Sequence, residues 1–281
     1  MSGDPEFRAD LYRGTARFYD EFRVAYPDRL LDDLRVRARI TGTGRLLDLA
    51  CGTGQITFGL GSSFAEVWAV DQEPEAVAFA RTNALTHGVD NVRWIAGRAE
   101  DIDADRYFEL VAIGNAFHRL PRRVVAESAM RWLAPGGHLA LLWSNSPWDG
   151  SLAWQKVMAD TLNRWTREAA TTDRVPANLD QHLAEEPHTK VLAAAGFTII
   201  GEFEFETPYE WSIEKLTGFM YSTSVLSQPA LGRNVQAFEH DLREQLLAVE
   251  PDGVFREPIS FSYTLARRPR AAQNAAGPRR S

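Results

Sequence analysis

The sequence predicts an α/β fold, a doubly wound sheet of mainly parallel strands with helices on both faces. From residue 45 onward, short apolar runs rich in β-branched residues alternate with amphipathic helical stretches. A glycine-rich turn follows the first of these runs. The chain has 281 residues, 44% of them hydrophobic and 25% charged, which is enough for one folded core with a cap.

Short apolar runs bounded by glycine, proline or charge predict five strands in order. They cover residues 45–49, 66–70, 92–95, 109–113 and 138–143. Apolar residues at helical spacing predict helices over 73–87 and 122–133, the second ended by Pro135, Gly136 and Gly137. These helices would pack on the sheet.

The flanking parts differ from this pattern. Residues 197–205 and 259–266 have strand character, and helical stretches at 212–226 and 230–249 lie between them. Residues 28–39 have helical character, and five aromatic residues gather just before them, at Tyr12, Phe18, Tyr19, Phe22 and Tyr26. We therefore expect an N-terminal segment that folds over a site and a helical insertion before the last strand. Residues 267–281 are rich in Arg, Ala and Pro and predict a disordered tail.

Composition excludes several classes of function. A single cysteine, Cys51, excludes disulfides and cysteine metal clusters, and His182 and His188 are too isolated to argue for a metal. Asp plus Glu number 38 against 31 Lys plus Arg, and a net charge of −7 disfavours nucleic acid as a partner. The polar start and the lack of a long apolar run predict a cytoplasmic protein without a signal peptide or membrane contact.

The segment that carries most chemistry is the strand, turn and helix start around Asp48, Ala50, Gly52 and Gly54. Glycines let the backbone turn sharply and approach a ligand at the carboxyl end of a strand. The dinucleotide fingerprint needs a third small residue where Thr57 stands, and no Lys-Ser/Thr pair follows for a P-loop. An NAD-linked oxidoreductase stays open as an alternative on fold alone.

This segment resembles the first motif of the class I S-adenosylmethionine-dependent methyltransferases, with Ala50 in place of the family's first glycine. Three further segments resemble that family in the same order: Asp71-Gln72, the run from Gly97 to Ile102, and the run from Gly114 to Leu120. Tyr19, Arg23 and Tyr26 resemble the lead-in of its bacterial small-molecule members, the methyltransferase type 11 and trans-aconitate-methyltransferase-like group. The family's Asn/Asp-Pro-Pro-aromatic run of base methylation is absent at the fourth strand.

The resemblance implies S-adenosylmethionine as cofactor, S-adenosylhomocysteine as its product, and a seven-stranded Rossmann-like sheet with an antiparallel last strand. It implies an ammonium contact for Asp48, a ribose grip for Asp71, an adenine contact at Ala99 and Glu100, and a carboxylate contact for Arg23. The cofactor residues implied are Tyr19, Arg23, Asp48, Ala50, Gly52, Thr53, Gly54, Asp71, Gln72, Ala99, Glu100 and Asn115.

His118 is the candidate catalytic residue, because it follows the fourth strand beside the expected methyl and has an ordinary pKa near 6.5. A structural histidine is the open alternative, since transfer from a sulfonium needs alignment more than a base. Aromatic residues give large contact area, and those proposed to face the substrate are Tyr12, Trp143, Trp148 and Tyr221.

The predicted organisation is lid helices over 1–40, a cofactor-binding core over 41–206, a helical cap over 207–255, a last core strand over 256–268 and a tail over 269–281. The predicted function is methyl transfer to an oxygen or nitrogen of a small molecule, such as a secondary metabolite or small carboxylate. The alternative is a non-catalytic cofactor-binding protein of the same fold. The chain would act as a monomer or a homodimer, since cap helices also suit a dimer interface.

Overall fold

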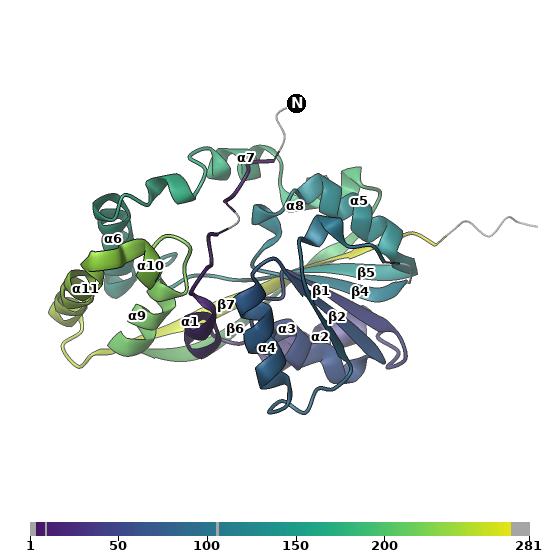
Figure 1. Cartoon of the computed structure of the whole chain (residues 1–281), viewed down its shortest axis with the longest axis horizontal. Coiled ribbons are helices and arrows are strands. Elements are labelled where there is room, and N and C mark those ends of the chain that lie inside the picture. Colours follow the sequence, from purple (N-terminus) through teal and green to yellow (C-terminus); the bar gives the residue numbers. More distant parts are fainter. Residues whose placement is uncertain (1–3, 9, 105–106, 271–281) are drawn as a thin grey trace, which may run out of the picture.

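A computed structural model describes residues 4–8, 10–104 and 107–270. Seven strands form one sheet in the order β3-β2-β1-β4-β5-β7-β6 (Figure 1). The first five strands are parallel to one another, and β7 pairs antiparallel with both β5 and β6. The predicted α/β class and the antiparallel last strand are confirmed.

The central strands are buried on both faces, which explains their nearly continuous apolar runs. All residues of β1 after the first are buried, and so are five of the seven in β4. The strands are β1 (Arg45–Leu49), β2 (Glu66–Asp71), β3 (Val92–Ala96), β4 (Phe108–Gly114), β5 (Leu133–Ser144), β6 (Thr198–Ser212) and β7 (Val254–Arg267).

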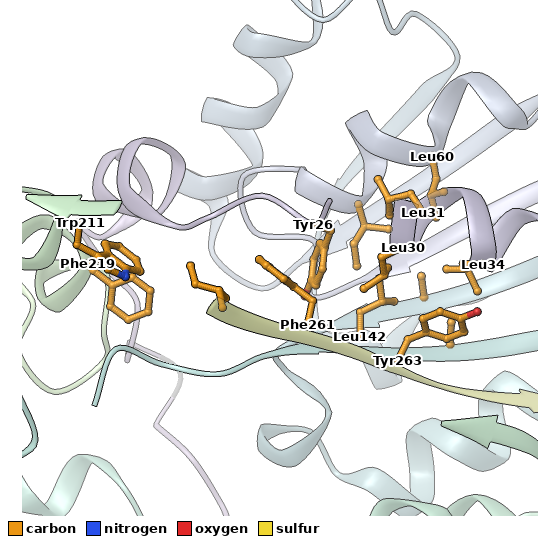
Figure 2. Close-up of a cluster of buried hydrophobic side chains, with 14 of the residues drawn as sticks. Tyr26, Leu30, Leu31, Leu34, Leu60, Leu142, Trp211, Phe219, Phe261 and Tyr263 are labelled. Carbon is orange, nitrogen blue, oxygen red and sulfur yellow. The ribbon is translucent and has the colours of Figure 1, made fainter. Parts of the chain in front are cut away.

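Helices cover the two faces of the sheet with separate apolar clusters. One cluster joins α2 and α3 to one face through Leu30, Leu34 and Leu60, and it continues to Trp211 at the end of β6 and Phe219 of α9 (Figure 2). The other joins α5 and α8 to the opposite face. The helices are α1 (Ala16–Phe22), α2 (Asp28–Arg37), α3 (Gln55–Leu60), α4 (Pro74–Ala84), α5 (Arg122–Trp132), α6 (Ala153–Glu168), α7 (Leu179–Glu185), α8 (His188–Ala194), α9 (Ile213–Tyr221), α10 (Gln228–Leu231) and α11 (Val235–Val249).

Strands β6 and β7 run on together beyond the sheet centre and carry the cap. Their antiparallel pairing runs from Thr198 opposite Arg267 to Ser212 opposite Val254, with one register shift between Ile199 and Gly201. Pro208 lies opposite Pro258, so two residues without an N–H share one position of the ladder. The strand therefore continues through Pro208, beyond the predicted end at residue 205.

The structure changes several predicted bounds. The insertion between β6 and β7 begins at Ile213, not at residue 207, and a loop after α11 leads into β7. The single helix predicted over 230–249 is divided at Gly232, whose φ of +55° departs from helical geometry. The helix predicted over 122–133 ends at Trp132, because β5 already begins at Leu133.

Helix α6 belongs with the cap although it precedes β6 in sequence. It packs against α11, and Trp165 of α6 stacks edge-on against Phe238 of α11. Figure 1 shows α6, α9, α10 and α11 together at the end of the molecule away from α4 and α5. The predicted organisation places α6 in the core, because its packing partner α11 lies about 75 residues further along the chain and leaves no local signal in the sequence of α6.

The two ends of the chain complete the fold. In Figure 1 the N-terminal segment runs from beside α7 to α1, and α1 packs against α9 of the cap. Residues 271–281 of the predicted tail lie outside the described residues, and Arg267 still belongs to β7. Among the helices that the structure describes, none has the length and apolar character to cross a membrane.

Candidate functional site

The glycine turn between β1 and α3 takes backbone conformations that other residues avoid. Gly52 and Gly54 have φ of +54° and +94°, and Ala50 is held at +53° despite its side chain. A Cβ on Gly54 would lie 2.9 Å from Phe58 Cε2 and 3.2 Å from Trp94 Cη2. The turn is therefore tightly fitted, with Thr53 buried inside it.

Asp48 lies fully buried at the carboxyl end of β1. Its Oδ2 accepts hydrogen bonds from the Thr57 amide at 3.0 Å and the Thr57 hydroxyl at 2.7 Å. Its Oδ1 is buried without a hydrogen-bond partner among the described residues. Burial raises the pKa of Asp48 to about 7. A buried carboxylate with one free oxygen is suited to a cationic donor.

Two further acids stand at the end of β2. Asp71 Oδ2 accepts from the Gly52 amide and Oδ1 from the Glu73 amide, each at 2.8 Å. Each oxygen keeps one lone pair for another donor. Glu73 is buried, and its Oε1 has no hydrogen-bond partner among the described residues. Burial raises the pKa of both carboxyls. Sequence reasoning does not single out Glu73, although its place directly after Asp71-Gln72 offers a signal.

The remaining predicted contacts of this edge lie after β2 and β3. Ala99 is buried, and Glu100 is partly buried and accepts a hydrogen bond from Arg98 at 2.7 Å. Gln72 is exposed beside Asp71. The Gly97 amide donates to the Asp71 carbonyl at 2.9 Å, which ties the two strand ends together. The predicted cofactor residues after β1, β2 and β3 therefore share one edge of the sheet.

A narrow pocket, here called the α1–α9 pocket, lies where helix α1 meets the cap. Its lining includes Tyr19, Arg23, Asn115, Trp211 and Phe219, and it holds about 10 Å³ of space for a water centre, enough for about one water. The Arg23 guanidinium lies 4.1 Å from the Phe219 ring centroid and 5.1 Å from that of Tyr19. Arg23 Nε also donates to Ser222 Oγ at 2.8 Å, so Arg23 connects the end of α1 to the end of α9.

Asn115 closes this pocket at the carboxyl end of β4. It has φ of +50°, and its side chain accepts from the Ser144 amide at 3.0 Å. Its amide nitrogen donates to Ser144 Oγ at 3.1 Å and to the Tyr26 hydroxyl at 3.2 Å. These contacts fix Asn115 between lid and sheet. Ser144 is a partner that sequence reasoning misses, because it comes from β5.

His118 lies in a short 3-10 turn, Phe117–Arg119, after β4. Its ring packs edge-on against Trp143 at 5.1 Å, and its Nδ1 is buried without a hydrogen-bond partner among the described residues. Burial and the nearby Arg119, His188 and Arg122 lower its pKa to about 3. The imidazole is therefore neutral at physiological pH, and its surroundings resist protonation.

The four residues predicted to face the substrate do not gather in one place. Trp143 is 42% exposed on β5, and Trp148 packs edge-on against Phe219 beside the α1–α9 pocket. Tyr12 lies under the Arg119 guanidinium at 5.3 Å. Tyr221 is buried in the cap, where its hydroxyl donates to Glu239 at 2.6 Å. We therefore place Tyr221 with the packing residues of the cap.

His182 is not isolated in the structure. Asp4, His182 and Glu186 bring possible metal-ligand atoms within 4.8 Å of one another. The Arg122 guanidinium, 1% exposed, contacts Asp4 Oδ1 at 2.8 Å, His182 Nε2 at 2.7 Å and the Glu186 carbonyl at 2.7 Å. A fixed positive charge already fills this cluster, so we describe it as a buried ion-pair network.

Residues 46–137 match the family model described as "Methyltransferase domain". This stretch holds the glycine turn, Asp48, Asp71 and the sheet edge described above. The match is to a methyltransferase domain and covers this part of the chain alone. The four motifs that resemble this family all lie within the matched domain.

The curated relatives of this chain are also named methyltransferases. An uncharacterized methyltransferase of Mycobacterium tuberculosis is 34% identical over 148 residues, covering 52% of this chain and 56% of the relative. An uncharacterized methyltransferase of Schizosaccharomyces pombe is 27% identical over 212 residues, covering 75% and 77%. An uncharacterized RNA methyltransferase of Bacillus cereus is 41% identical over 71 residues, covering 25% of this chain and 16% of the relative. The chain thus spans about half the length of the mycobacterial relative.

Solved structures share the fold of most of this chain. A Bacillus halodurans protein proposed to be a methyltransferase superposes with a TM-score of 0.54 at 20% identity, covering 85% of this chain and 98% of that one. The [4+2]-cyclase SpnF superposes with a TM-score of 0.55 at 18% identity, covering 96% and 100%. At these identities the likeness concerns the fold alone.

Proposed function

We propose that the chain is an S-adenosylmethionine-dependent methyltransferase that acts on an oxygen or nitrogen of a small organic molecule. The observation that carries this proposal is the buried Asp48 Oδ1, which lacks a partner among the described residues beside the strained glycine turn. An unpaired buried carboxylate oxygen is costly unless a donor reaches it. An amino-acid ammonium supplies such a donor.

The surrounding residues fit the rest of this cofactor. Asp71 retains lone pairs for two ribose hydroxyls, and Ala99 and Glu100 stand at the neighbouring strand end for an adenine. A Cβ on Gly52 would lie 3.9 Å from Tyr19 Cε1. A larger residue at this position would therefore enter the space between the glycine turn and α1. When bound, the cofactor supplies an activated methyl group on a sulfonium.

The residues around the α1–α9 pocket would orient the acceptor and exclude water. Tyr19, Phe219 and Trp211 form apolar walls, and Asn115 is held rigidly by Tyr26 and Ser144. Displacement on an activated methyl depends mainly on alignment, which a closed and rigid site provides. The narrowness of the pocket implies that α1 or the cap moves when ligands enter.

A small acceptor is favoured over RNA by two observations. The lid and the cap meet directly over the strand ends, through Arg23 and Ser222, which leaves a small enclosed space. The net charge of −7 opposes a phosphate backbone. The match to the RNA methyltransferase covers a quarter of this chain. RNA therefore serves as the competing acceptor in the test below.

The first experiment is calorimetric titration of the full chain with S-adenosylmethionine and S-adenosylhomocysteine. We expect binding that Asp48→Ala weakens by at least about 30-fold, or about 2 kcal/mol, because a charge-assisted hydrogen bond is lost. Gly52→Val should abolish binding. Gly88→Val is the matched control, since Gly88 also has positive φ, +62°, with nothing within 4 Å of its Cβ position.

Methyl transfer is then measured with labelled cofactor against small hydroxylated and amine-bearing molecules and against total tRNA. Transfer to a small molecule supports the proposal. Transfer to tRNA alone contradicts the acceptor class. Cofactor binding without transfer to either would favour a non-catalytic protein, and an intact fold without cofactor binding would contradict the site.

A further inference from the structure

A second and larger cavity, here called the sheet groove, lies on the opposite face of the sheet from the α1–α9 pocket. Residues alternate between faces along β5, so Ser144 lines the pocket and Trp143 lines the groove. The groove holds about 260 Å³ for water centres, against about 10 Å³ in the pocket. It is large enough for a small organic molecule.

The floor of the groove is built from three neighbouring strands in two matched rows. In one row Trp143 of β5 lies opposite Ser262 of β7, which lies opposite Glu204 of β6. In the next row Leu141, Thr264 and Glu202 are paired in the same way. The groove therefore presents an apolar column, a hydroxyl column and a carboxylate column side by side.

Within the apolar column Leu141 is buried, but Trp143 presents its ring to the groove. Trp143 is 42% exposed although it is one of the largest side chains of the sheet. Phe117 and Leu183, from the turn after β4 and from α7, continue the apolar wall above it. An exposed tryptophan in a cavity provides a flat surface for an aromatic or aliphatic body and for a cation.

The two side chains of the carboxylate column, Glu202 and Glu204, have few polar partners within the protein. Glu202 accepts one long hydrogen bond from Thr264 at 3.4 Å. The Glu204 side chain has no hydrogen-bond or ion-pair partner among the residues that the structure describes. Both are exposed at the rim on the edge strand of the sheet. Two adjacent carboxylates at one end of a cavity attract a positive group.

Three of the described basic residues lie at the groove or contact its lining. His118 packs against Trp143 and is neutral, because its pKa is lowered to about 3. His188 lines the groove, and burial together with Arg122 lowers its pKa to about 4, so it is uncharged at neutral pH. Arg122 itself contacts Asp4 and Glu186. The local charge facing a ligand is therefore negative.

We propose that the sheet groove is a binding site for a small amphiphilic cation, whose apolar body lies on Trp143 and whose ammonium lies at Glu202 and Glu204. The two outer columns are two strand spacings apart, roughly 10 Å, which sets the length of the ligand. The proposal concerns binding and does not depend on methyl transfer.

Three probes of one shape and different charge test it: phenylbutylamine, phenylbutanol and phenylbutyrate. Each is titrated into the full chain at low ionic strength, with the Trp143 indole resonance as a local readout, assigned by its loss in Trp143→Phe. We expect the amine to bind at least about tenfold more tightly than the carboxylate, with the alcohol between them, and added salt to reduce the difference.

Charge variants locate the cation. Glu204→Gln and Glu202→Gln should each weaken amine binding about three- to tenfold and leave the alcohol unchanged. Glu206→Gln is the matched control, because Glu206 is two residues further along the same strand but does not line the groove. Equal affinity for the three probes, or equal effects of Glu204→Gln and Glu206→Gln, would overturn the proposal.

Discussion

At the scale of single residues, the buried acids at the strand ends set the chemistry of the candidate site. Asp48 and Asp71 could be predicted from the sequence, because the carboxyl ends of parallel strands meet at one edge. Their hydrogen-bond partners could not. The orphan Oδ1 of Asp48 depends on how Thr57 takes the other oxygen, which only the tertiary structure shows.

Asp48 should make the ligand-free protein less stable as pH rises. Its folded pKa is about 7 against an ordinary 3.8, so the unfolded state ionises first, and the stability that the group contributes below pH 4 is lost through pH 7. Asp48→Asn cannot ionise. We therefore expect the unfolding free energy of the variant, relative to that of the natural protein, to rise by about 2–4 kcal/mol from pH 5 to pH 8. Urea unfolding at the two pH values measures this difference. The same stability difference at both pH values would contradict the pKa shift.

His118 should act by packing and not as a general base. A neutral imidazole with a pKa of about 3 is a weak proton acceptor, and the neighbouring Arg119 and Arg122 oppose its protonation. Once a methyl acceptor is identified, His118→Gln should lower kcat less than about tenfold. The kcat of the natural protein should show no inflection near pH 6.5. A loss greater than about 100-fold together with such an inflection would restore His118 as the base.

At the scale of elements, the core strands could be predicted closely and the cap could not. Residues 45–49 coincide with β1, because a short apolar run between two glycine-containing segments is a local signal. The extent of β6 to Ser212 and the place of α6 depend on distant partners, namely Pro258 opposite Pro208 and α11 against α6. Local patterns carry no information about such pairs.

The start of α5 should depend on the Arg122 network. Arg122 is 1% exposed and contacts Asp4 and Glu186, so Arg122→Met would remove the buried cation that faces these two carboxylates. We expect a loss of about 3–5 kcal/mol in unfolding free energy. Arg123→Met is the matched control, because Arg123 pairs with the same Glu186 but is 48% exposed, and it should lose less than about 1 kcal/mol. Equal losses in the two variants would show that burial does not govern this network.

At the scale of the whole molecule, an N-terminal strap joins the core to the cap. The strap comprises residues 4–8 and 10–15. Arg174 donates from its Nη2 to the Leu11 carbonyl at 3.0 Å and from its Nε to the Ser224 carbonyl of the cap at 2.6 Å. The Gly14 amide donates to Glu75 of α4 at 2.9 Å. The strap thus contacts α4 directly and is linked to the cap through Arg174.

This connection predicts that the strap opens when ligands enter the narrow α1–α9 pocket. Hydrogen exchange of the strap amides should be fast in the free protein and slower with saturating S-adenosylhomocysteine, because the ligand stabilises the closed form. Arg174→Ala should raise exchange of the strap in the free protein and leave β4 unchanged, since β4 lies in the buried sheet. Exchange of the strap that stays the same on saturation would mean that ligands enter by another route, such as movement of α9 alone.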